Sequence, residues 1–236
     1  MAGHSKWANI KRRKEQVDAK KGKIFSRLVR EIRSAIKQGG PDLHSNSKLR
    51  IALQKAKSAN LPNEIIERNM KKGSAIDQLD YEEIMYELYG YGGIGILVEI
   101  MTDNKNRAAS EIRIAINKKG GSIATPGAVR FNFEERGILH FTSNNSSREA
   151  FIMKAIENGA IDIEKEGGDI IVLTPPDKLY EIKEALQGEE ICIEANLEMI
   201  PKSYIECEEE DRRANEALLE RLRSIDDVEA IYHNMK

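Results

Sequence analysis

The spacing of apolar residues changes near residue 80, and this change constrains the fold more than any other feature of the chain. Before that point apolar residues recur every three or four positions, which is typical of amphipathic helices. After it, short runs with strand spacing alternate with short helical segments, and none has the length of a buried parallel strand. The sequence therefore predicts an α+β protein in which a helical bundle domain precedes two small ferredoxin-like domains with antiparallel sheets.

The charge of the chain changes at the same place. The whole chain carries 37 basic and 39 acidic side chains, with a net charge of −2. The first 80 residues hold 19 of the basic and 8 of the acidic residues, so their net charge is +11 and that of the remainder is −13. Such a basic end indicates a polyanionic partner, with a chance fluctuation of surface charge as the alternative.

The basic segment is expected to form three helices, over residues 22–39, 46–59 and 63–72. The first is stopped by Gly39, Gly40 and Pro41 and places its apolar residues on one face. Its opposite face is basic and includes Ser34, and we expect it to contact phosphates; a face that only keeps the helix soluble is the alternative. The basic residues expected on that face are Lys23, Arg27, Arg30, Arg33 and Lys37.

The segment before the first helix is also strongly basic. Its side chains would neutralise phosphates and release counterions, which gives salt-sensitive binding to many sequences. Trp7 either stacks on a nucleobase or anchors the segment against the helices. The predicted nucleic-acid contacts in this basic arm are His4, Lys6, Trp7, Lys11, Arg12, Arg13, Lys14, Lys20 and Lys21.

The stretch YGYGGIG has the spacing G-x-G-x-x-G that cradles a pyrophosphate in dinucleotide-binding proteins. In those proteins the last glycine opens a helix, whereas here it opens the apolar, β-branched run IGILVEIM, which is typical of a strand. Over residues 83–88 the apolar side chains tend to recur at every second position, which is typical of a strand. We therefore predict a hairpin in which Gly90, Gly92 and Gly93 adopt positive φ angles, and no cofactor site.

The segment from Thr102 to Gly121 is expected to form a helix capped by Thr102, Asp103 or Asn104. Lys105 and Arg107 fall in its first turn, where the helix dipole already presents positive charge. Phosphate binding at this end is one explanation of their position, and a solvated helix start is the other.

The rest of the chain alternates between helices and strands. We expect strands over 128–133 and 138–141, on either side of a turn at 135–137, and a helix over 147–158 that turns Ile156 inward. Further strands are expected over 161–163, 170–173, 191–196 and 228–232, and further helices over 177–186 and 212–224. These elements predict three domains: residues 1–78, residues 79–129 with 204–236, and an inserted domain over 130–203.

Nothing in the sequence indicates an enzyme. The four histidines lack metal-ligand spacing, and nucleophile-elbow and phosphate-loop motifs are absent. The acidic run over 206–211 could hold Mg²⁺, but stabilising the start of the next helix is the favoured explanation. We predict no catalytic residue, cofactor, metal or small-molecule substrate. Two cysteines, no secretory signal and no apolar run that could cross a bilayer predict a cytoplasmic protein that contacts no membrane.

Several segments carry a resemblance to a known family. The opening GHSKWANIK and KRRKEQVDAKKGKIFSRLVREI, the stretches YEEIMYELYGYGGIGILVEIMTDNKNRAASEIR and KKGGSIATPGAVRFNF, and the ending IDDVEAIYHNM resemble the YebC/PmpR family of probable transcriptional regulators. The mitochondrial translational activators of cytochrome c oxidase subunit one belong to the same family. The chain departs from the usual pattern at Arg12, Leu88, Tyr91 and Ser122.

The resemblance implies a regulator of gene expression that binds DNA. A ribosome-associated translation factor that binds ribosomal RNA is the alternative, because phosphate contacts do not distinguish DNA from RNA. No recognition helix of the helix-turn-helix type is evident. The acidic α+β portion would have a structural role. Ribosomal or other basic proteins are further candidate partners.

Overall fold

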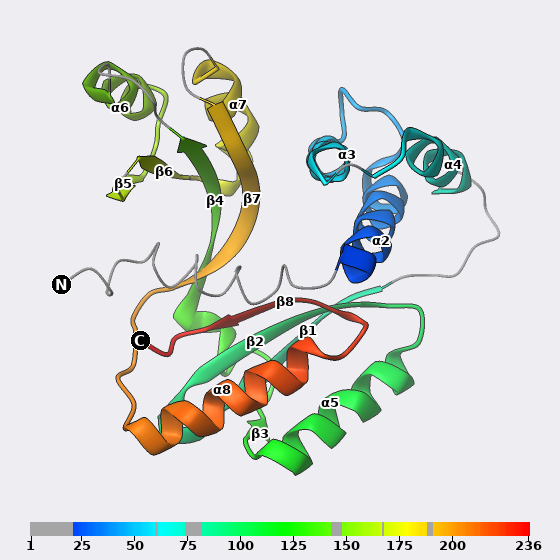
Figure 1. Ribbon diagram of the computed structural model, residues 1–236, viewed down its shortest axis with the longest axis vertical. Helices are drawn as coiled ribbons and strands as arrows, with labels where there is room; N and C mark the ends of the chain where they lie inside the picture. The colour runs from blue at the N-terminus through cyan, green and yellow to red at the C-terminus, as the bar shows by residue number, and fades with distance from the viewer. Residues whose placement is uncertain (1–20, 60, 74–81, 143–147, 167, 188–190) are drawn as a thin grey trace. The chain divides into compact units, whose positions relative to one another are not determined.

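The computed structural model describes residues 21–59, 61–73, 82–142, 148–166, 168–187 and 191–236. These residues divide into two compact units, one made of 21–133 with 201–236 and the other of 134–200. Figure 1 shows helices together with two separate sheets. The prediction of an α+β fold with antiparallel sheets is confirmed. The predicted boundaries of three domains stay a prediction.

Three helices form the beginning of the described chain: α2 (Lys21–Gly39), α3 (Ser47–Ser58) and α4 (Asn63–Gly73). Buried Asn46 connects the first two. Its Oδ1 accepts a hydrogen bond from the N–H of Leu49 at 3.0 Å and caps α3, while its Nδ2 donates to the carbonyls of Ala35 and Gly40, each at 2.7 Å. The apolar positions expected from the helical period fill the common core, which contains Leu28, Ile32, Ala35, Ile36, Leu49, Ala52, Ala56, Leu61 and Ile66.

The first sheet contains β1 (Glu82–Tyr89), β2 (Gly95–Thr102), β3 (Ser122–Ile123) and β8 (Val228–His233) in the order β3-β1-β2-β8. Every neighbouring pair is antiparallel. Helices α5 (Lys105–Lys119) and α8 (Glu209–Arg223) cover one face of this sheet (Figure 1). The core between them includes Leu88, Ile96, Val98, Ile100, Ile112, Ala115, Leu218 and Leu222.

The glycine stretch is the β1–β2 hairpin, with the short helix η1 (Tyr91–Gly93) at its tip. Gly92 and Gly93 have φ angles of 64° and 76°, as expected, and Gly95 opens a strand, so the stretch is not a dinucleotide cradle. The expected positive φ at Gly90 is wrong, because its φ is −90°. Gly90 is constrained by space: a Cβ there would collide with Oδ1 of Asn215 in α8.

Asn215 itself is fully buried and fixes the hairpin tip. Its Oδ1 accepts from the N–H of Tyr91 at 2.8 Å, and its Nδ2 donates to the Tyr91 carbonyl at 3.1 Å. Gly90→Ala is expected to lower the free energy of unfolding by about 2 kcal/mol through overpacking. The same substitution in an Asn215→Ala background is expected to cost less than about 1 kcal/mol, since the obstacle is gone. Urea unfolding of the four proteins measures this coupling, and strictly additive costs would contradict the prediction.

The second unit follows the order strand, helix, strand, strand, helix, strand. Its elements are β4 (Phe133–Thr142), α6 (Arg148–Glu157), β5 (Asp162–Glu166), β6 (Asp169–Thr174), η3 (Pro176–Lys178), α7 (Leu179–Ala185) and β7 (Ile191–Pro201). The strand order β5-β6-β4-β7 is that of a ferredoxin-like sheet. Phe141 and Phe151 pack edge to face in its core, with their ring centroids 4.9 Å apart.

Three expectations about this region are wrong. Residues 128–133 do not form a strand; a turn and the short helix η2 (Arg130–Asn132) precede β4, which runs without a turn through residues 135–137. The buried Glu87 carboxylate explains the difference, because it accepts the N–H groups of Gly127, Val129 and Arg130 at 2.5–2.8 Å. Those N–H groups are thus not available to a sheet. Ile156, expected inward, is 55% exposed.

Candidate nucleic-acid interface

The polar face of α2 does not form the open basic stripe expected from the sequence. The side chains of Arg27 and Arg30 are only 31% and 14% exposed. Ser34, on the same face, is buried and donates a hydrogen bond to Oε1 of Glu83 in β1 at 2.7 Å. This part of the face therefore contacts the protein itself. Carboxylates distant in sequence lie against it, and phosphate binding by its basic residues stays a prediction.

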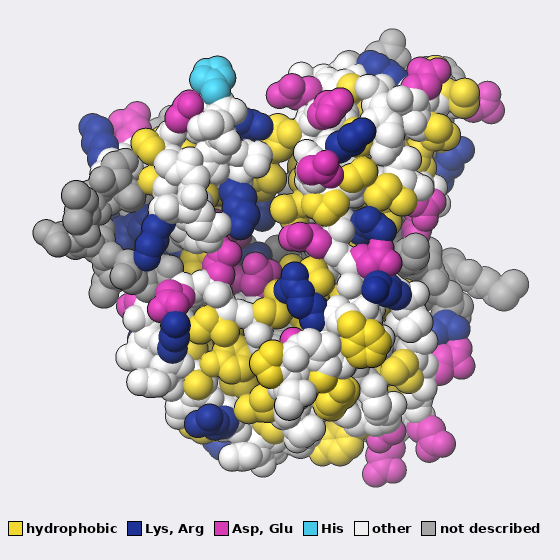
Figure 2. All heavy atoms as spheres, turned by 180° about the vertical axis from the view of Figure 1, so that it is seen from behind, with side chains coloured by type: hydrophobic (Ala, Val, Ile, Leu, Met, Phe, Trp, Pro, Cys, Tyr) yellow, Lys and Arg dark blue, Asp and Glu magenta, His cyan; other side chains and the backbone are white. Residues whose placement is uncertain are grey.

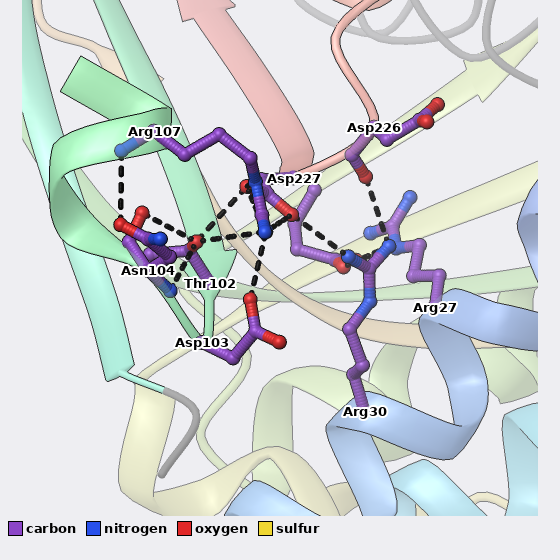
Figure 3. Close-up of polar contacts among 9 residues, drawn as sticks. Arg27, Arg30, Thr102, Asp103, Asn104, Arg107, Asp226 and Asp227 are labelled. Carbon is purple, nitrogen blue, oxygen red and sulfur yellow. Dashed lines mark hydrogen bonds and ion pairs between the residues drawn. The ribbon is translucent and has the colours of Figure 1, made fainter. Parts of the chain in front are cut away.

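The arginines of α2 form ion pairs with acidic residues near the C-terminus. Nε of Arg27 lies 2.6 Å from Oε2 of Glu229 and 3.2 Å from Oε1 of Glu31. Arg30 lies 3.4 Å from Glu229 and 3.5 Å from Asp227, and it donates to the Asp226 carbonyl at 2.9 Å (Figure 3). These contacts join the helical segment to the start of β8.

Arg107 meets the same acidic cluster from the start of α5 (Figure 3). Its Nη2 donates to Asp227 at 2.8 Å and to Asp103 at 2.7 Å, and these hydrogen bonds raise the pKa of its guanidinium. Thr102 donates to Asp227 at 2.9 Å, and of the three expected caps it is the Asn104 side chain that accepts the N–H of Arg107 at 3.0 Å. The positive charge in this first turn is thus matched by the protein's own carboxylates.

Lys105, the other cation predicted at the start of α5, pairs with Glu82 at 2.6 Å while its side chain stays 59% exposed. An exposed pair of this kind contributes little to stability and leaves the ammonium group accessible. Lys105 is therefore open to a further anion, whereas Arg107 already has two carboxylate partners.

Three carboxylates in or next to α2 have shifted pKa values. Burial raises the pKa of Glu229 to about 7, although Arg27 and Arg30 favour its charged form. Burial also raises the pKa of Glu99, which accepts a hydrogen bond from the Tyr232 hydroxyl at 3.1 Å. Burial opposes ionisation of Glu31 too, but Lys55 and Arg27 outweigh it and lower the pKa. The cluster is thus a buried contact of mixed charge.

Other cations in the helical segment remain accessible. Residues 21–73 contain 13 basic and 4 acidic residues, so the segment keeps a large positive excess after its internal pairs are formed. Arg33 donates to Asn69 at 2.8 Å, and Lys37 is exposed. Sequence reasoning did not single out Lys57, Arg68 and Lys71, which are exposed and form no ion pair with any described residue. Their position on a helix surface was the signal that could have found them.

The remaining predicted contacts cannot be placed. His4, Lys6, Trp7, Lys11, Arg12, Arg13, Lys14 and Lys20 lie outside the described residues, as do the side chains of Lys21 and Lys23. Their role in binding stays a prediction.

The described residues offer little basis for other chemistry. Among them no group of three or more His, Cys, Asp or Glu side chains could hold a metal ion. Burial raises the pKa of both cysteine thiols, Cys192 and Cys207, which keeps them protonated and weakly nucleophilic. Glu209, Glu210 and Asp211 lie in the first turn of α8, where negative charge stabilises the helix. No helix in the described segments is long and apolar enough to cross a membrane.

These features define a class of α+β protein in which one unit joins a cationic three-helix segment by ion pairs to a four-stranded sheet, and a second unit is ferredoxin-like. Two protein-family models match this chain. The model described as the TACO1/YebC protein N-terminal domain matches residues 5–76, and that of the TACO1/YebC second and third domain matches residues 81–235. The chain belongs to the TACO1/YebC family, which confirms the resemblance seen in its sequence.

Relatives of similar length support this assignment. The chain is 55% identical to a probable transcriptional regulatory protein of Protochlamydia amoebophila, in an alignment covering all of this chain and 97% of that protein. It is 49% identical to a probable transcriptional regulatory protein of Chlamydia trachomatis serovar L2, over the whole of both. A conserved hypothetical protein from Aquifex aeolicus has a similar crystal structure, with a TM-score of 0.83, 38% identity and coverage of 93% of this chain and 92% of that one.

Proposed function

We propose that this protein is a non-enzymatic, cytoplasmic regulator of gene expression that binds nucleic acid through its phosphates. The observation that carries the proposal is the positive excess of the N-terminal segment, 13 basic against 4 acidic residues over 21–73, with a strongly basic arm before it. Relatives named as probable transcriptional regulatory proteins support a regulatory role. They also favour double-stranded DNA as the first partner to test.

The ion pairs narrow the set of residues that would bind. Arg27, Arg30 and Arg107 already have carboxylate partners, and a phosphate would have to displace them at a cost. Exposed cations without such partners, among them Lys57 and Arg68, would exchange only water and counterions for a phosphate. We therefore place the contact on the basic arm and the exposed cations of α3 and α4.

The arm provides the most direct test. Replacing Lys11, Arg12, Arg13 and Lys14 with Ala is expected to weaken binding to a DNA duplex about tenfold at moderate salt. The slope of log K against log salt is expected to become shallower by up to about 3.6, because each of the four phosphates no longer neutralised contributed about 0.9. Fluorescence anisotropy over a salt series measures both quantities.

A charge-matched control separates the arm from net charge. It replaces four exposed lysines of the acidic portion and its ferredoxin-like unit with Ala: Lys154, Lys165, Lys178 and Lys202. This control makes the same change in net charge and is expected to bind within about twofold of the parent, because the proposal assigns no phosphate contact to these lysines. Equal losses in both variants would show that the arm is not the contact.

The choice between DNA and ribosomal RNA needs a measurement in cells. Crosslinking followed by sequencing of both DNA and RNA is expected to enrich promoter DNA if the protein regulates transcription. Enrichment of ribosomal RNA would replace this proposal with the alternative, a ribosome-associated translation factor.

A further inference from the structure

The contact between α2 and the first sheet is rich in charged and polar side chains. Helices α2, α3 and α4 share one apolar core, and the sheet shares a separate core with α5 and α8. Among the described side chains, ion pairs and hydrogen bonds of Arg27, Arg30, Ser34 and Lys48 link the two parts. Separating α2 from the sheet would therefore leave both of these cores in place.

Two arginines of α2 bind carboxylates as they would bind phosphates. Arg27 lies 2.6 Å from Glu229, and Arg30 lies 3.4 Å from the same carboxylate. Asp227 lies 3.5 Å from Arg30 (Figure 3). A guanidinium pairs with the oxygens of a carboxylate or of a phosphate in the same way, so the two anions compete for it. Asp227 and Glu229 thus occupy a part of α2 that a nucleic acid could use.

A β-bulge lies at Glu229. In the pairing of β2 with β8, Glu99 is opposite Ala230 and Ile100 is opposite Val228, so Glu229 is an extra residue in the ladder. Bulges of this kind change the direction in which a side chain points. The sheet is therefore irregular at the residue whose carboxylate meets α2.

The contact leaves several buried polar atoms poorly satisfied. Nε of Arg30 and both carboxylate oxygens of Glu229 are buried, and none makes a hydrogen bond of good geometry with any described residue. Burying such atoms costs free energy, which water or a better placed partner would return. A buried ion pair also loses much of its attraction to desolvation. The contact is thus weaker than its charges alone suggest, and a competing anion can displace it.

Opening the contact would uncover a row of cations. Arg27, Arg30, Arg33 and Lys37 follow one another every three or four residues along α2, over about 15 Å. On the face of the molecule shown in Figure 2, by contrast, the Lys and Arg side chains of the described residues are scattered among acidic and apolar ones. A continuous row neutralises neighbouring phosphates of one backbone, which scattered cations do less well.

We propose that the acidic residues of the first sheet close a nucleic-acid-binding face on α2, and that the protein binds nucleic acid more tightly when this contact opens. The carboxylates of Asp227 and Glu229 act as an internal competitor for phosphates. Only the open form offers Arg27 and Arg30 in addition to the basic arm, so the affinity rises with the fraction of open protein. This inference rests on the proposed function and adds to it an autoinhibitory contact.

A wedge that changes no charge tests the inference on the full-length protein. Ser34 is 4% exposed and donates to Glu83, so the larger side chain of Ser34→Gln is expected to separate α2 from the sheet. This variant is expected to bind a DNA duplex about fivefold more tightly than the parent, measured by fluorescence anisotropy at moderate salt. The control Ser58→Gln makes the same substitution at an exposed position of α3 and is expected to change the affinity less than twofold.

Arginine substitutions test whether the gain comes from α2. Adding Arg27→Gln and Arg30→Gln to the wedge variant is expected to remove the gain completely. Arg113→Gln with Arg213→Gln removes the same charge from exposed positions of α5 and α8, and in the wedge variant this pair is expected to change the affinity less than twofold. A gain that persists without Arg27 and Arg30 would overturn the inference, as would equal affinities of the wedge variant and the parent.

A cross-link that holds the contact closed supplies a second readout, which does not depend on the wedge. Ser34→Cys and Glu83→Cys are combined in a protein whose Cys192 and Cys207 are replaced by Ser, and a short bis-maleimide links the pair. Linking is expected to weaken duplex binding about fivefold relative to the same protein before linking.

The cross-link also separates this inference from the proposed function. Unchanged binding after linking, or a pair of cysteines that cannot be linked, would overturn the autoinhibitory contact, while binding through the basic arm would stand. Failure of the unaltered protein and of the wedge variant to bind nucleic acid even at low salt would overturn the proposed function as well.

Discussion

Asp227→Ala is expected to lower the free energy of unfolding by about 3 kcal/mol. Asp227 is only 4% exposed and accepts hydrogen bonds from Arg107 at 2.8 Å and from Thr102 at 2.9 Å, with Arg30 at 3.5 Å. Removing the carboxylate takes its best-placed acceptor from the buried Thr102 hydroxyl and leaves the largely buried Arg30 guanidinium with only Glu229 and the Asp226 carbonyl. The cost of burying donors that have lost an acceptor, more than the loss of attraction itself, determines the size of this effect. Urea unfolding at pH 7 measures it.

Two neighbouring substitutions provide matched controls. Asp226→Ala removes an adjacent but exposed carboxylate and keeps the backbone carbonyl that accepts from Arg30, so a change below about 0.5 kcal/mol is expected. Arg107→Ala is expected to cost about 1 kcal/mol, because that side chain is 45% exposed and water replaces part of its contact. If Asp227→Ala cost no more than Asp226→Ala, the ion-pair cluster would have no role in stability.

The helical part of the fold could be predicted because its signals are local. The spacing of Leu28, Ile32 and Ile36 determines which face of α2 is buried, and Asn46 caps α3 through a bond to Leu49, three residues away. The β1–β2 hairpin was predictable for the same reason, since glycines at positive φ separate two strands. Each of these features depends on neighbours within a few positions along the chain.

The ion-pair cluster could not be predicted from such signals. Arg30 and Asp227 are 197 residues apart, and Arg107 and Asp227 are 120 apart. A helix face rich in Arg has the same pattern whether it contacts phosphate, water or the protein's own carboxylates. Only the fold shows that the acidic residues of the C-terminal segment DDVE meet α2. The sequence showed that the polar face of α2 is positively charged, but it did not show which anionic group lies against that face.

The region from 127 to 133 was mispredicted for a related reason. The apolar residues around Arg130 have strand spacing, but the Glu87 carboxylate of a different segment binds the N–H groups that a strand would use. A tertiary contact thus overrides a local preference. Phe131, in the short helix η2 that forms there instead of a strand, is 63% exposed.

Glu229→Gln is expected to change how stability depends on pH. In the folded protein burial raises the pKa of Glu229 to about 7 from its ordinary value of 4.5. Between these two values the folded state holds a proton that the unfolded state has lost. The contribution of Glu229 to stability is therefore present at pH 4.5 and declines as the pH rises through 7. Gln cannot titrate, so the variant lacks this decline.

The expected result is a variant about as stable as the parent at pH 5 and more stable by up to about 3 kcal/mol at pH 8, each pKa unit contributing about 1.4 kcal/mol. Arg27, Arg30, Glu31 and Glu99 contribute to the potential at this carboxyl, and they are unchanged in both proteins. Urea unfolding at several pH values measures the difference. A difference that stays constant from pH 5 to pH 8 would contradict a raised pKa at Glu229.

The stability of Glu31→Gln relative to the parent should change with pH in the opposite direction, so this variant controls for the sign of the effect. Lys55 and Arg27 lower the pKa of Glu31, so its carboxylate contributes stability that is present above pH 4.5 and lost as the pH falls below it. This variant is expected to be less stable than the parent at pH 8, with the gap closing in acid. Opposite pH trends from two carboxylates that share Arg27 would show that burial dominates at Glu229 and ion pairing at Glu31. Parallel trends would mean that the two groups titrate as one coupled unit.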